Sequence, residues 1–436
     1  MMSLAILVLV LAFTILVVLN VPVAFSMGIA ALLGLLLMPD IFFPLQTIAL
    51  QMATSIDSFA LLAIPFFILS GLLMGQGGIA RRLIDFANVI MGRMRGGLAL
   101  VNIMTCMLFG SISGSAAAAV SSIGGFMIPI MNKMGYHRDF NAAVTITAAT
   151  TGLLIPPSNV MIVYSLATGG ACSIAALFMA GVVPGVLVGF GLMAVAFVLS
   201  CKNNYGKGET FTLKESVLRF FRAVPPLLLI VIVLGGILGG IFTATEASAI
   251  AVVYSFILSV FVYREVKWKD LPKLILQSAV TTAVVMMLVA TSMALSWVLT
   301  YENVPQNISA FLMSFTNTGW VVLLLINILL LIVGCFMDMT PAVLIFTPIF
   351  LPVMKKFNVD ILQFGIVMIA NLCIGLCTPP VGTCLFLGCG IAQTTVTKVL
   401  KYILPFYVAM VIVLLLLTYI PELSLWLPQA LGLVRR

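Results

Sequence analysis

Two short stretches of the sequence, "GLLIPPSNV" at residues 152–160 and "GLCTPPVGT" at residues 375–383, decide the fold. Each sets two adjacent prolines inside a long apolar segment. A proline in a helix interior removes a backbone donor and clashes with the preceding turn, so each segment is predicted to contain a break. Backbone groups left unpaired at membrane depth are tolerated only where protein buries them or where they line a water-filled cavity. Both breaks are therefore expected at a functional site.

The composition indicates an integral membrane protein. Of the 436 residues, 63% are hydrophobic and only 8% are charged, and the mean hydropathy is +1.27. Soluble domains carry about 25% charged residues, so this chain cannot cover a water-exposed surface. We attribute the net charge of +8 to basic cytoplasmic loops and not to nucleic-acid binding. The first apolar run has no basic residue before it, so we interpret it as a span rather than a cleaved signal.

Ten membrane spans are predicted from the apolar runs, which have the length that a bilayer requires. They cover residues 3–20, 22–38, 58–77, 140–168, 174–200, 223–242, 244–263, 276–300, 360–390 and 402–420. The stretches 78–95 and 303–317 mix polar and apolar residues and are too short for a span. We expect them to lie at the membrane interface as amphipathic connectors.

Two further apolar segments, 98–131 and 319–354, are interrupted by the polar stretches "GSISGSAAAA" from Gly110 and "GCFMDMTPAV" from Gly334. If the basic loops all lie in the cytoplasm, each segment must enter and leave the membrane on one side. We therefore predict two re-entrant hairpins, with both chain termini on the periplasmic side. Four of the 21 Lys and Arg residues would then lie outside: Lys355, Lys356, Arg435 and Arg436.

An internal repeat relates the two halves of the chain, 1–212 and 213–436. With a shift of 223 residues, 11 of the 39 positions from Ala119 to Pro157 are identical without a gap. Each half holds five spans and one hairpin. Because five is odd, the second copy enters the membrane upside down, as in the inverted repeats of secondary transporters. The predicted fold is an all-α polytopic membrane protein built from two inverted repeats.

The breaks and hairpin tips predict a site for a hard cation. Half-helix C-termini aim carbonyl oxygens at a cation, and half-helix N-termini aim amides at an anion. Hydroxyl oxygens add further ligands, so Na+ is the simplest cation for the site. Candidate ligands of the cation, through side-chain or backbone oxygens, are Ser111, Ser115, Gly152, Pro156, Gly334, Asp338, Thr340, Gly375, Thr378 and Gly382. Candidate substrate-binding residues are Ser113, Ser115, Ser158, Asn159 and Thr383.

Other interpretations of these residues stay open. Small residues such as "SGSAAAA" also mediate helix packing in membranes. Asp338 could ligate a cation, relay a proton or lie in water at the mouth of a hairpin. Glu246 is expected to cap a helix N-terminus, and the eight cysteines are interpreted as small buried hydrophobic residues. We find no phosphate-binding loop and no nucleophile–base–acid set, so neither direct ATP coupling nor enzymatic activity is predicted.

From end to end, the chain resembles the large membrane subunit of tripartite ATP-independent periplasmic (TRAP) transporters. The resemblance is carried by "GSISGSAAAAVSSIG" from Gly110, "ATTGLLIPPSNVMIVYSLATG" from Ala149, "GCFMDMTPAVLIFTPIFLPV" from Gly334 and "NLCIGLCTPPVGTCLF" from Asn371. It implies Na+-coupled import of organic acids, of the C4-dicarboxylate or sialic acid type, across a bacterial inner membrane. The hairpins and broken spans would move as an elevator against a scaffold.

The resemblance also implies two partner proteins. A periplasmic binding protein would deliver the acid, and a small four-helix membrane subunit, expected here as a separate chain, would complete the complex. Two alternatives remain open at this point. One is a stand-alone ion-coupled carboxylate transporter of the same superfamily, and the other is a channel.

Overall fold

The structure is a computed structural model that describes residues 4–37, 42–206, 212–315 and 318–434. These residues form helices joined by turns, and none of them lies in a strand. The elements are α1 (Leu4–Val18), α2 (Val23–Leu35), α3 (Phe42–Ile56), η1 (Phe59–Leu62), α4 (Ala63–Gln76), α5 (Ile79–Met91), α6 (Gly97–Ser113), α7 (Ala116–Ala119), η2 (Val120–Gly124), α8 (Gly125–Lys133), α9 (Arg138–Thr151), α10 (Asn159–Ala167), α11 (Ile174–Lys202), α12 (Leu213–Leu238), α13 (Ala244–Phe256), η3 (Ile257–Val262), α14 (Leu271–Tyr301), α15 (Val304–Phe315), α16 (Gly319–Phe336), α17 (Met339–Lys356), α18 (Ile361–Gly375), α19 (Thr383–Ala392), α20 (Val396–Tyr419) and α21 (Glu422–Ala430).

Most of the predicted spans are confirmed as long apolar helices. Within the described ranges, eight helices have the length and composition to cross a bilayer: Phe59–Gln76, Ile174–Lys202, Lys214–Leu238, Ala244–Val262, Leu271–Tyr301, Gly319–Phe336, Met339–Lys356 and Val396–Tyr419. Two of these helices, α16 and α17, were predicted as the arms of the second hairpin. The all-helical membrane fold predicted from composition is therefore confirmed.

The first two predicted spans are shorter than expected. The runs 3–20 and 22–38 correspond to α1 and α2, which have only 15 and 13 residues, whereas a straight crossing needs about 20. The turn between them explains why the two helices are short, because Asn20 adopts a left-handed conformation and Pro22 is the N-cap of α2. Residues 3 and 38 of these two predicted spans, like Arg435 and Arg436 at the other terminus, lie outside the described residues.

Helices α3 and α21 were not predicted. Helix α3 carries Pro44, Gln46, Gln51 and several Thr and Ser residues among its apolar positions, so no continuous apolar run signals it. It packs against α14 and α2. The connectors predicted at 78–95 and 303–317 contain the amphipathic helices α5 and α15, and their place at the membrane interface stays a prediction. Residues 316–317 lie outside the described ranges.

Both predicted interruptions are helix–turn–helix pairs. Helix α6 ends at Ser113, the chain turns at Gly114 in the left-handed conformation, and α7, η2 and α8 pack back along α6. We call residues 97–133 the first hairpin. The second hairpin, residues 319–356, turns at Met337 and Asp338 between α16 and α17.

Both proline pairs interrupt a helical segment, as predicted. Helix α9 stops at Thr151 and α10 starts at Asn159, so residues 152–158 form the first break. Helix α18 stops at Gly375 and α19 starts at Thr383, so residues 376–382 form the second break. The peptide bonds Pro156–Pro157 and Pro379–Pro380 are both cis.

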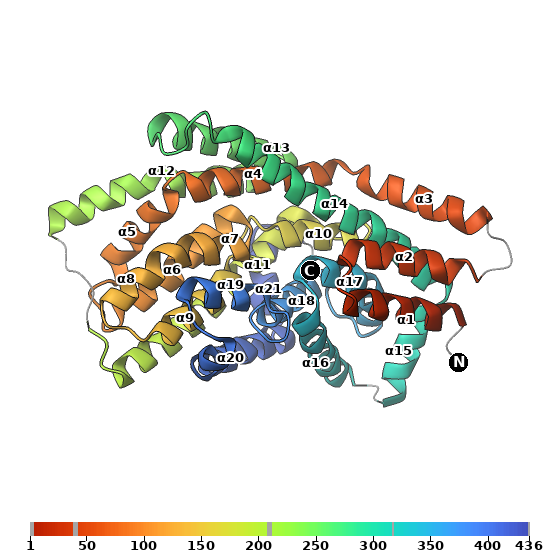
Figure 1. The fold of residues 1–436 in the computed structure, drawn as a ribbon. Helices are drawn as coiled ribbons and strands as arrows, with labels where there is room; N and C mark the ends of the chain where they lie inside the picture. The colour runs from red at the N-terminus through yellow and green to blue at the C-terminus, as the bar shows by residue number, and fades with distance from the viewer. Residues whose placement is uncertain (1–3, 38–41, 207–211, 316–317, 435–436) are drawn as a thin grey trace.

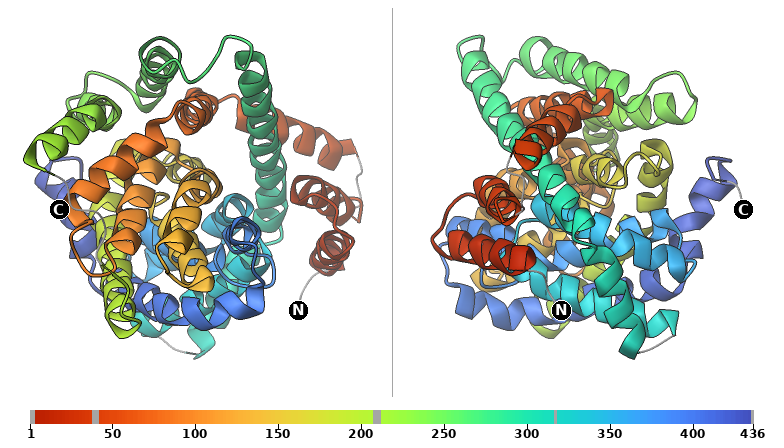
Figure 2. Two further views of the ribbon diagram at one scale, coloured as in Figure 1. Left: turned by 60° about the vertical axis from the view of Figure 1, so that its left-hand side comes forward. Right: turned by 90° about the vertical axis from the view of Figure 1, so that its right-hand side faces the viewer.

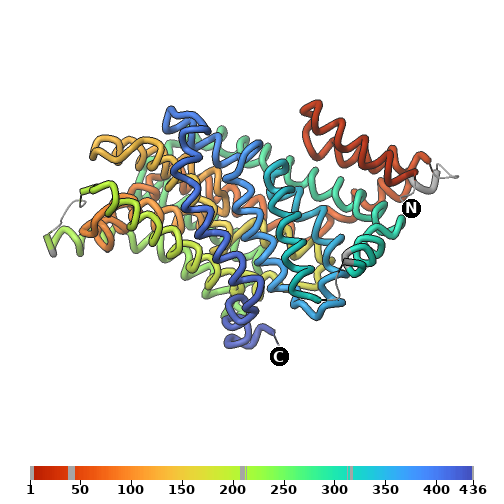
Figure 3. Tube along the Cα trace, turned by 90° about the horizontal axis from the view of Figure 1, so that it is seen from below, coloured from red at the N-terminus to blue at the C-terminus, as the bar shows by residue number. Residues whose placement is uncertain are grey.

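The helices form two groups (Figure 1). We call α1–α4 and α12–α14 the frame, and α6–α11 with α16–α20 the central bundle, which holds both hairpins and both breaks. The long helix α14 stands between α1–α3 and the central bundle (Figure 2, left). Helices α1 and α2 lie side by side at one edge of the molecule (Figure 3). Helix α5 leads from α4 to α6 and α15 leads from α14 to α16, so these two connectors join the frame to the central bundle.

Candidate ion and substrate site

Pairs of glycines bring each hairpin directly against a break. A Cβ added at Gly152 would lie only 2.3 Å from the Cα of Gly110, and one added at Gly375 would lie 2.6 Å from the Cα of Gly334. No side chain fits between backbones this close, so the glycines allow carbonyls and amides of hairpin and break to share one small space. Three predicted cation ligands, Gly152, Gly334 and Gly375, lie at these contacts.

The first break holds two polar atoms without a protein partner. Ser158, the N-cap of α10, is fully buried, and its Oγ makes no hydrogen bond within the described residues. The neighbouring Asn159 has a buried Oδ1 that also lacks a partner there. The amide nitrogen of Asn159 lies beside Gly114 at the tip of the first hairpin. Because a buried polar atom without a partner is strongly destabilising, these oxygens indicate a ligand.

The three serines at the tip of the first hairpin, Ser111, Ser113 and Ser115, use their hydroxyls locally. Ser111 Oγ donates to the Leu108 carbonyl at 2.8 Å, and Ser113 Oγ donates to the Ser115 carbonyl at 3.4 Å. Ser115 Oγ accepts from the Ala118 amide at 3.3 Å as the N-cap of α7. The oxygens of Ser111 and Ser113 therefore keep lone pairs that can accept from a ligand or contact a cation.

In the second half, the oxygens come from Asp338 and the second break. Asp338 is the N-cap of α17, and its carboxylate lies within hydrogen-bonding reach of the Thr383 hydroxyl. Thr378 Oγ1 donates to the Ile374 carbonyl at 2.7 Å. A Cβ added at Gly382 would meet the Thr378 carbonyl at 2.7 Å, so this glycine keeps a position beside carbonyl oxygens open. The Val381 amide donates to the Cys335 carbonyl at 3.0 Å and ties the second break to the second hairpin.

A cavity of about 650 Å³ lies between the two hairpin tips and helices α4 and α14 of the frame. Its wall includes six of the predicted site residues: Ser113, Ser115, Asn159, Asp338, Thr340 and Thr383. The other eight do not line it: Ser111, Gly152, Pro156, Ser158, Gly334, Gly375, Thr378 and Gly382. The structure thus gathers residues from both halves around one cavity.

The frame contributes residues that the sequence motifs did not reveal. Gln76 on α4 and Gln277 and Thr281 on α14 line the cavity opposite the hairpins. Gln277 and Thr281 lie one helical turn apart on α14, and this spacing was the available signal. Of the residues that the structure describes, no Lys, Arg or His lines the cavity, and Asp338 is its single charged side chain.

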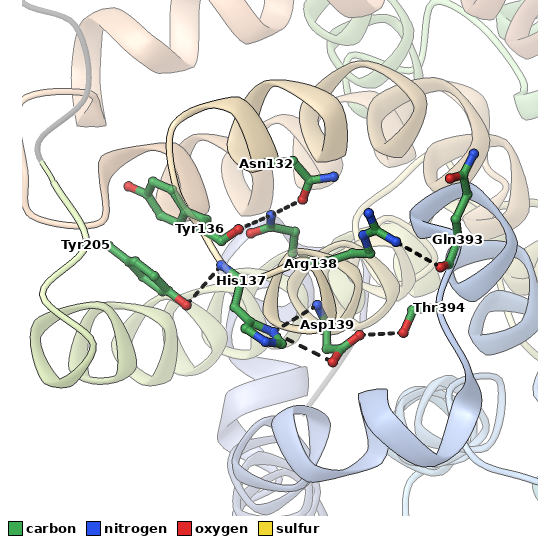
Figure 4. Close-up of polar contacts among 9 residues, drawn as sticks. Asn132, Tyr136, His137, Arg138, Asp139, Tyr205, Gln393 and Thr394 are labelled. Carbon is green, nitrogen blue, oxygen red and sulfur yellow. Dashed lines mark hydrogen bonds and ion pairs between the residues drawn. The ribbon is translucent and has the colours of Figure 1, made fainter.

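A second polar cluster joins segments that lie far apart along the chain and belong to different halves (Figure 4). Arg138 Nη1 donates to the Gln393 carbonyl at 3.2 Å, and the Thr394 hydroxyl donates to the buried carboxylate of Asp139. The Tyr205 hydroxyl accepts from the His137 amide at 3.1 Å. Burial raises the pKa of Tyr205 above that of an ordinary phenol, so this hydroxyl stays protonated. The cluster holds the start of α9 against the turn between α19 and α20.

Comparison with known proteins identifies the family. The sequence profile described as "Tripartite ATP-independent periplasmic transporter, DctM component" matches residues 10–423. The chain belongs to this DctM family. It is therefore the large permease subunit of a TRAP transporter, which is a transport protein and not an enzyme. The DctM family consists of multi-pass inner-membrane proteins that work with a small membrane subunit and a periplasmic binding protein.

Several DctM relatives match over most of the chain. An uncharacterized protein, YgiK, of Salmonella typhimurium is 47% identical, covering 96% of this chain and 95% of its own. The C4-dicarboxylate TRAP transporter large permease protein DctM of Pseudomonas aeruginosa is 41% identical, covering 94% and 95%. The isethionate TRAP transporter permease protein DctMQ of Oleidesulfovibrio alaskensis is 41% identical over 95% of this chain, which corresponds to 65% of its own length.

Solved structures share the fold at low sequence identity. The YdaH transporter of Alcanivorax borkumensis superposes with a TM-score of 0.58 at 13% identity, covering 96% of this chain and 98% of its own. The MtrF efflux pump of Neisseria gonorrhoeae gives a TM-score of 0.56 at 13% identity, covering 85% and 84%. The DctM chain thus has the fold of known transporters.

Proposed function

We propose that this permease is a symporter that uses a Na+ gradient to import small organic acids. The observation that carries the proposal is the pair of buried oxygens at the end of the first break, Ser158 Oγ and Asn159 Oδ1, which have no hydrogen-bond partner among the described residues. They lie beside a cavity that no basic side chain of those residues lines. The acid would be of the C4-dicarboxylate or sialic acid type. The C4-dicarboxylate names of three relatives favour the first of these.

The oxygens of the hairpin tips and breaks suit a small hard cation. They belong to hydroxyls, backbone carbonyls and the Asp338 carboxylate, and hard cations bind oxygen ligands of these kinds. In the first half, Ser111, Ser158 and the carbonyls of residues 152–156 would supply them. In the second half, Asp338, Thr340, Thr378 and the carbonyls beside Gly375 and Gly382 would do so. We assign Ser158 to the cation, because it is fully buried and does not line the cavity.

The cavity wall suits an anion that arrives with cations. The helical arm 116–133 and helices α10, α17 and α19 all begin at the hairpin tips or breaks. Their N-terminal amides carry partial positive charge and can bind a carboxylate. Ser113, Ser115, Asn159 and Thr383 add hydrogen-bonding groups. Since no basic side chain lines the cavity among the described residues, bound cations would supply the remaining positive charge.

The two glycine contacts support an origin by inverted repeat. Gly110 meets Gly152 in the first half as Gly334 meets Gly375 in the second, and the two proline pairs are 223 residues apart. We propose that the central bundle moves as an elevator between the two membrane faces while the frame stays fixed, with α5 and α15 as the moving arms.

The cavity touches only residues 277–288 of α14, near the end that follows Arg264, Lys267, Lys269 and Lys273. This end is cytoplasmic by the positive-inside rule, so the cavity would face the cytoplasm, with both chain termini periplasmic.

The test is uptake by the reconstituted complex. The chain, a separate small membrane subunit and a periplasmic binding protein would be combined in proteoliposomes with radiolabelled C4-dicarboxylates and sialic acids. We expect uptake of one acid class that saturates, depends on the binding protein and stops when the inward Na+ gradient is removed. Uptake that continues unchanged in K+ without Na+ would refute the Na+ proposal.

The same experiment separates the two alternatives. Uptake by this chain alone, without a binding protein, would identify a stand-alone carboxylate transporter. Ionic currents that do not saturate and do not depend on an acid would identify a channel.

A further inference from the structure

The tip of the first hairpin touches the frame at one glycine. Gly71 on α4 lies against Ser113, the last residue of α6, so closely that a Cβ added at Gly71 would meet the Ser113 carbonyl oxygen at 2.8 Å and its Cα at 3.0 Å. Real Cβ atoms essentially never approach backbone atoms this closely. Gly75, one turn further along the same face of α4, differs. A Cβ added there would meet Ser122 Oγ at 3.4 Å, which is ordinary contact.

The tip of the first hairpin cannot move aside to make room for an atom added at position 71. Gly114, next to Ser113, lies beside the amide of Asn159, and Gly110, one turn before, lies against the backbone of Gly152. The Ser113 hydroxyl is itself bonded to the Ser115 carbonyl. A push on the Ser113 carbonyl would therefore be transmitted to the first break and to the central bundle, because packed backbone does not rotate away as a side chain does.

We propose that Gly71 is the docking point that fixes the cytoplasm-open end position of the central bundle, an inference that rests on the elevator movement proposed above. In this position the hairpin tip reaches the frame backbone to backbone, which only a glycine allows. When the bundle moves toward the periplasm, Ser113 leaves Gly71, and a methyl group at position 71 no longer collides with it. A side chain at this position therefore destabilises one end position and spares the other.

The experiment compares Gly71→Ala with Gly75→Ala in the intact permease with its partner subunits. Both changes add one methyl group to the same face of the same helix, so helix propensity changes alike. A reporter thiol is introduced by Ala117→Cys on the cavity wall, in a background in which Cys384, the cavity's own thiol, is replaced by alanine. A membrane-impermeant maleimide is then applied from either side of oriented vesicles.

We expect Gly71→Ala to lower cytoplasmic labelling about tenfold and to raise periplasmic labelling, because overpacking against rigid backbone shifts the population. Gly75→Ala should label like the parent. Equal cytoplasmic labelling of the Gly71→Ala variant and the parent would overturn the proposal. Cys106 is fully buried, so its labelling in the Gly71→Ala variant would show that the packing of the bundle is lost. That result would also overturn the proposal, because Gly71 would then be needed for packing in every state.

The two proposals fail in different ways. If the parent shows no Na+-dependent uptake, the symport function fails, but the labelling comparison can still be read. If uptake is Na+-dependent and Gly71→Ala changes neither labelling nor uptake, only the docking role is refuted.

Discussion

At the scale of single residues, Asp338 holds a position that no other described residue shares. It is the one charged side chain on the cavity wall and the N-cap of α17, within reach of the Thr383 hydroxyl. Its carboxylate faces the cavity between the second hairpin and the second break. A carboxylate at that position attracts a cation that enters the cavity.

Replacing Asp338 tests this attraction. Asp338→Asn keeps the shape and removes the charge, so the Na+ concentration for half-maximal uptake should rise about tenfold, as expected when one charge is lost from a cation site of low dielectric. The measurement is initial uptake against Na+ concentration. Asp57→Asn, in an exposed loop outside the cavity, is the matched control. An unchanged Na+ dependence in the Asp338 variant would remove this residue from coupling.

The sequence predicted some site residues and not others for a physical reason. Pro156, Asn159 and Asp338 contradict their apolar surroundings, so each can be recognised without knowing its neighbours. Gly71 and Gln277 do not contradict theirs, because glycines and single polar side chains are common in membrane helices. Their roles come only from their positions against Ser113 and the cavity. A single sequence does not show which residues pack together.

At the scale of helices, proline and glycine determined what could be predicted. The breaks at 152–158 and 376–382 and both hairpins were found because these residues interrupt apolar runs. Helix α3 was not predicted because its polar residues give this segment the hydropathy of a loop. Helices α1 and α2 were predicted too long because the apolar signal continues through the turn at Asn20 and Pro22.

The link between α9 and the turn after α19 makes a prediction at this scale. Thr394→Val keeps the shape of the side chain but removes the hydroxyl that donates to the buried carboxylate of Asp139. Leaving that carboxylate short of a partner should lower the free energy of unfolding by about 1–3 kcal/mol. Thermal unfolding in detergent would measure the loss as a lower midpoint.

Thr397→Val provides the control, because the Thr397 hydroxyl is exposed and bonds only to that of Thr395. Equal midpoints for the two variants would show that the contact between Thr394 and Asp139 does not stabilise the packing of the two halves.

At the scale of the whole molecule, the arrangement in the membrane stays a prediction. The helices and their turns are observed, but the inverted orientation of the halves was inferred from the basic loops and the shift of 223 residues. That inference requires the first hairpin to return to the side from which it came. The residues that flank it, Met94 before α6 and Met134 after α8, are both exposed.

Thiols at these two positions decide the topology. We expect both variants, Met94→Cys and Met134→Cys, to react with an impermeant maleimide from the cytoplasmic side. Trp320→Cys and Asn358→Cys, which flank the second hairpin at exposed positions, should both react from the periplasmic side. Labelling of Met94→Cys and Met134→Cys from opposite faces would mean that the hairpin crosses the bilayer, and the inverted repeat would have to be abandoned.

A cavity wall with one fixed negative charge and no fixed positive one also suppresses leakage. An acid that entered alone would add its charge to that of Asp338, and the two like charges would repel each other. An empty bundle would have to carry the lone carboxylate past apolar helices, which is costly at membrane depth. Cations bound in sufficient number beside the acid would offset the charges of both. Under the proposed mechanism, electrostatics therefore opposes movement of the acid without its cations and movement of the empty bundle.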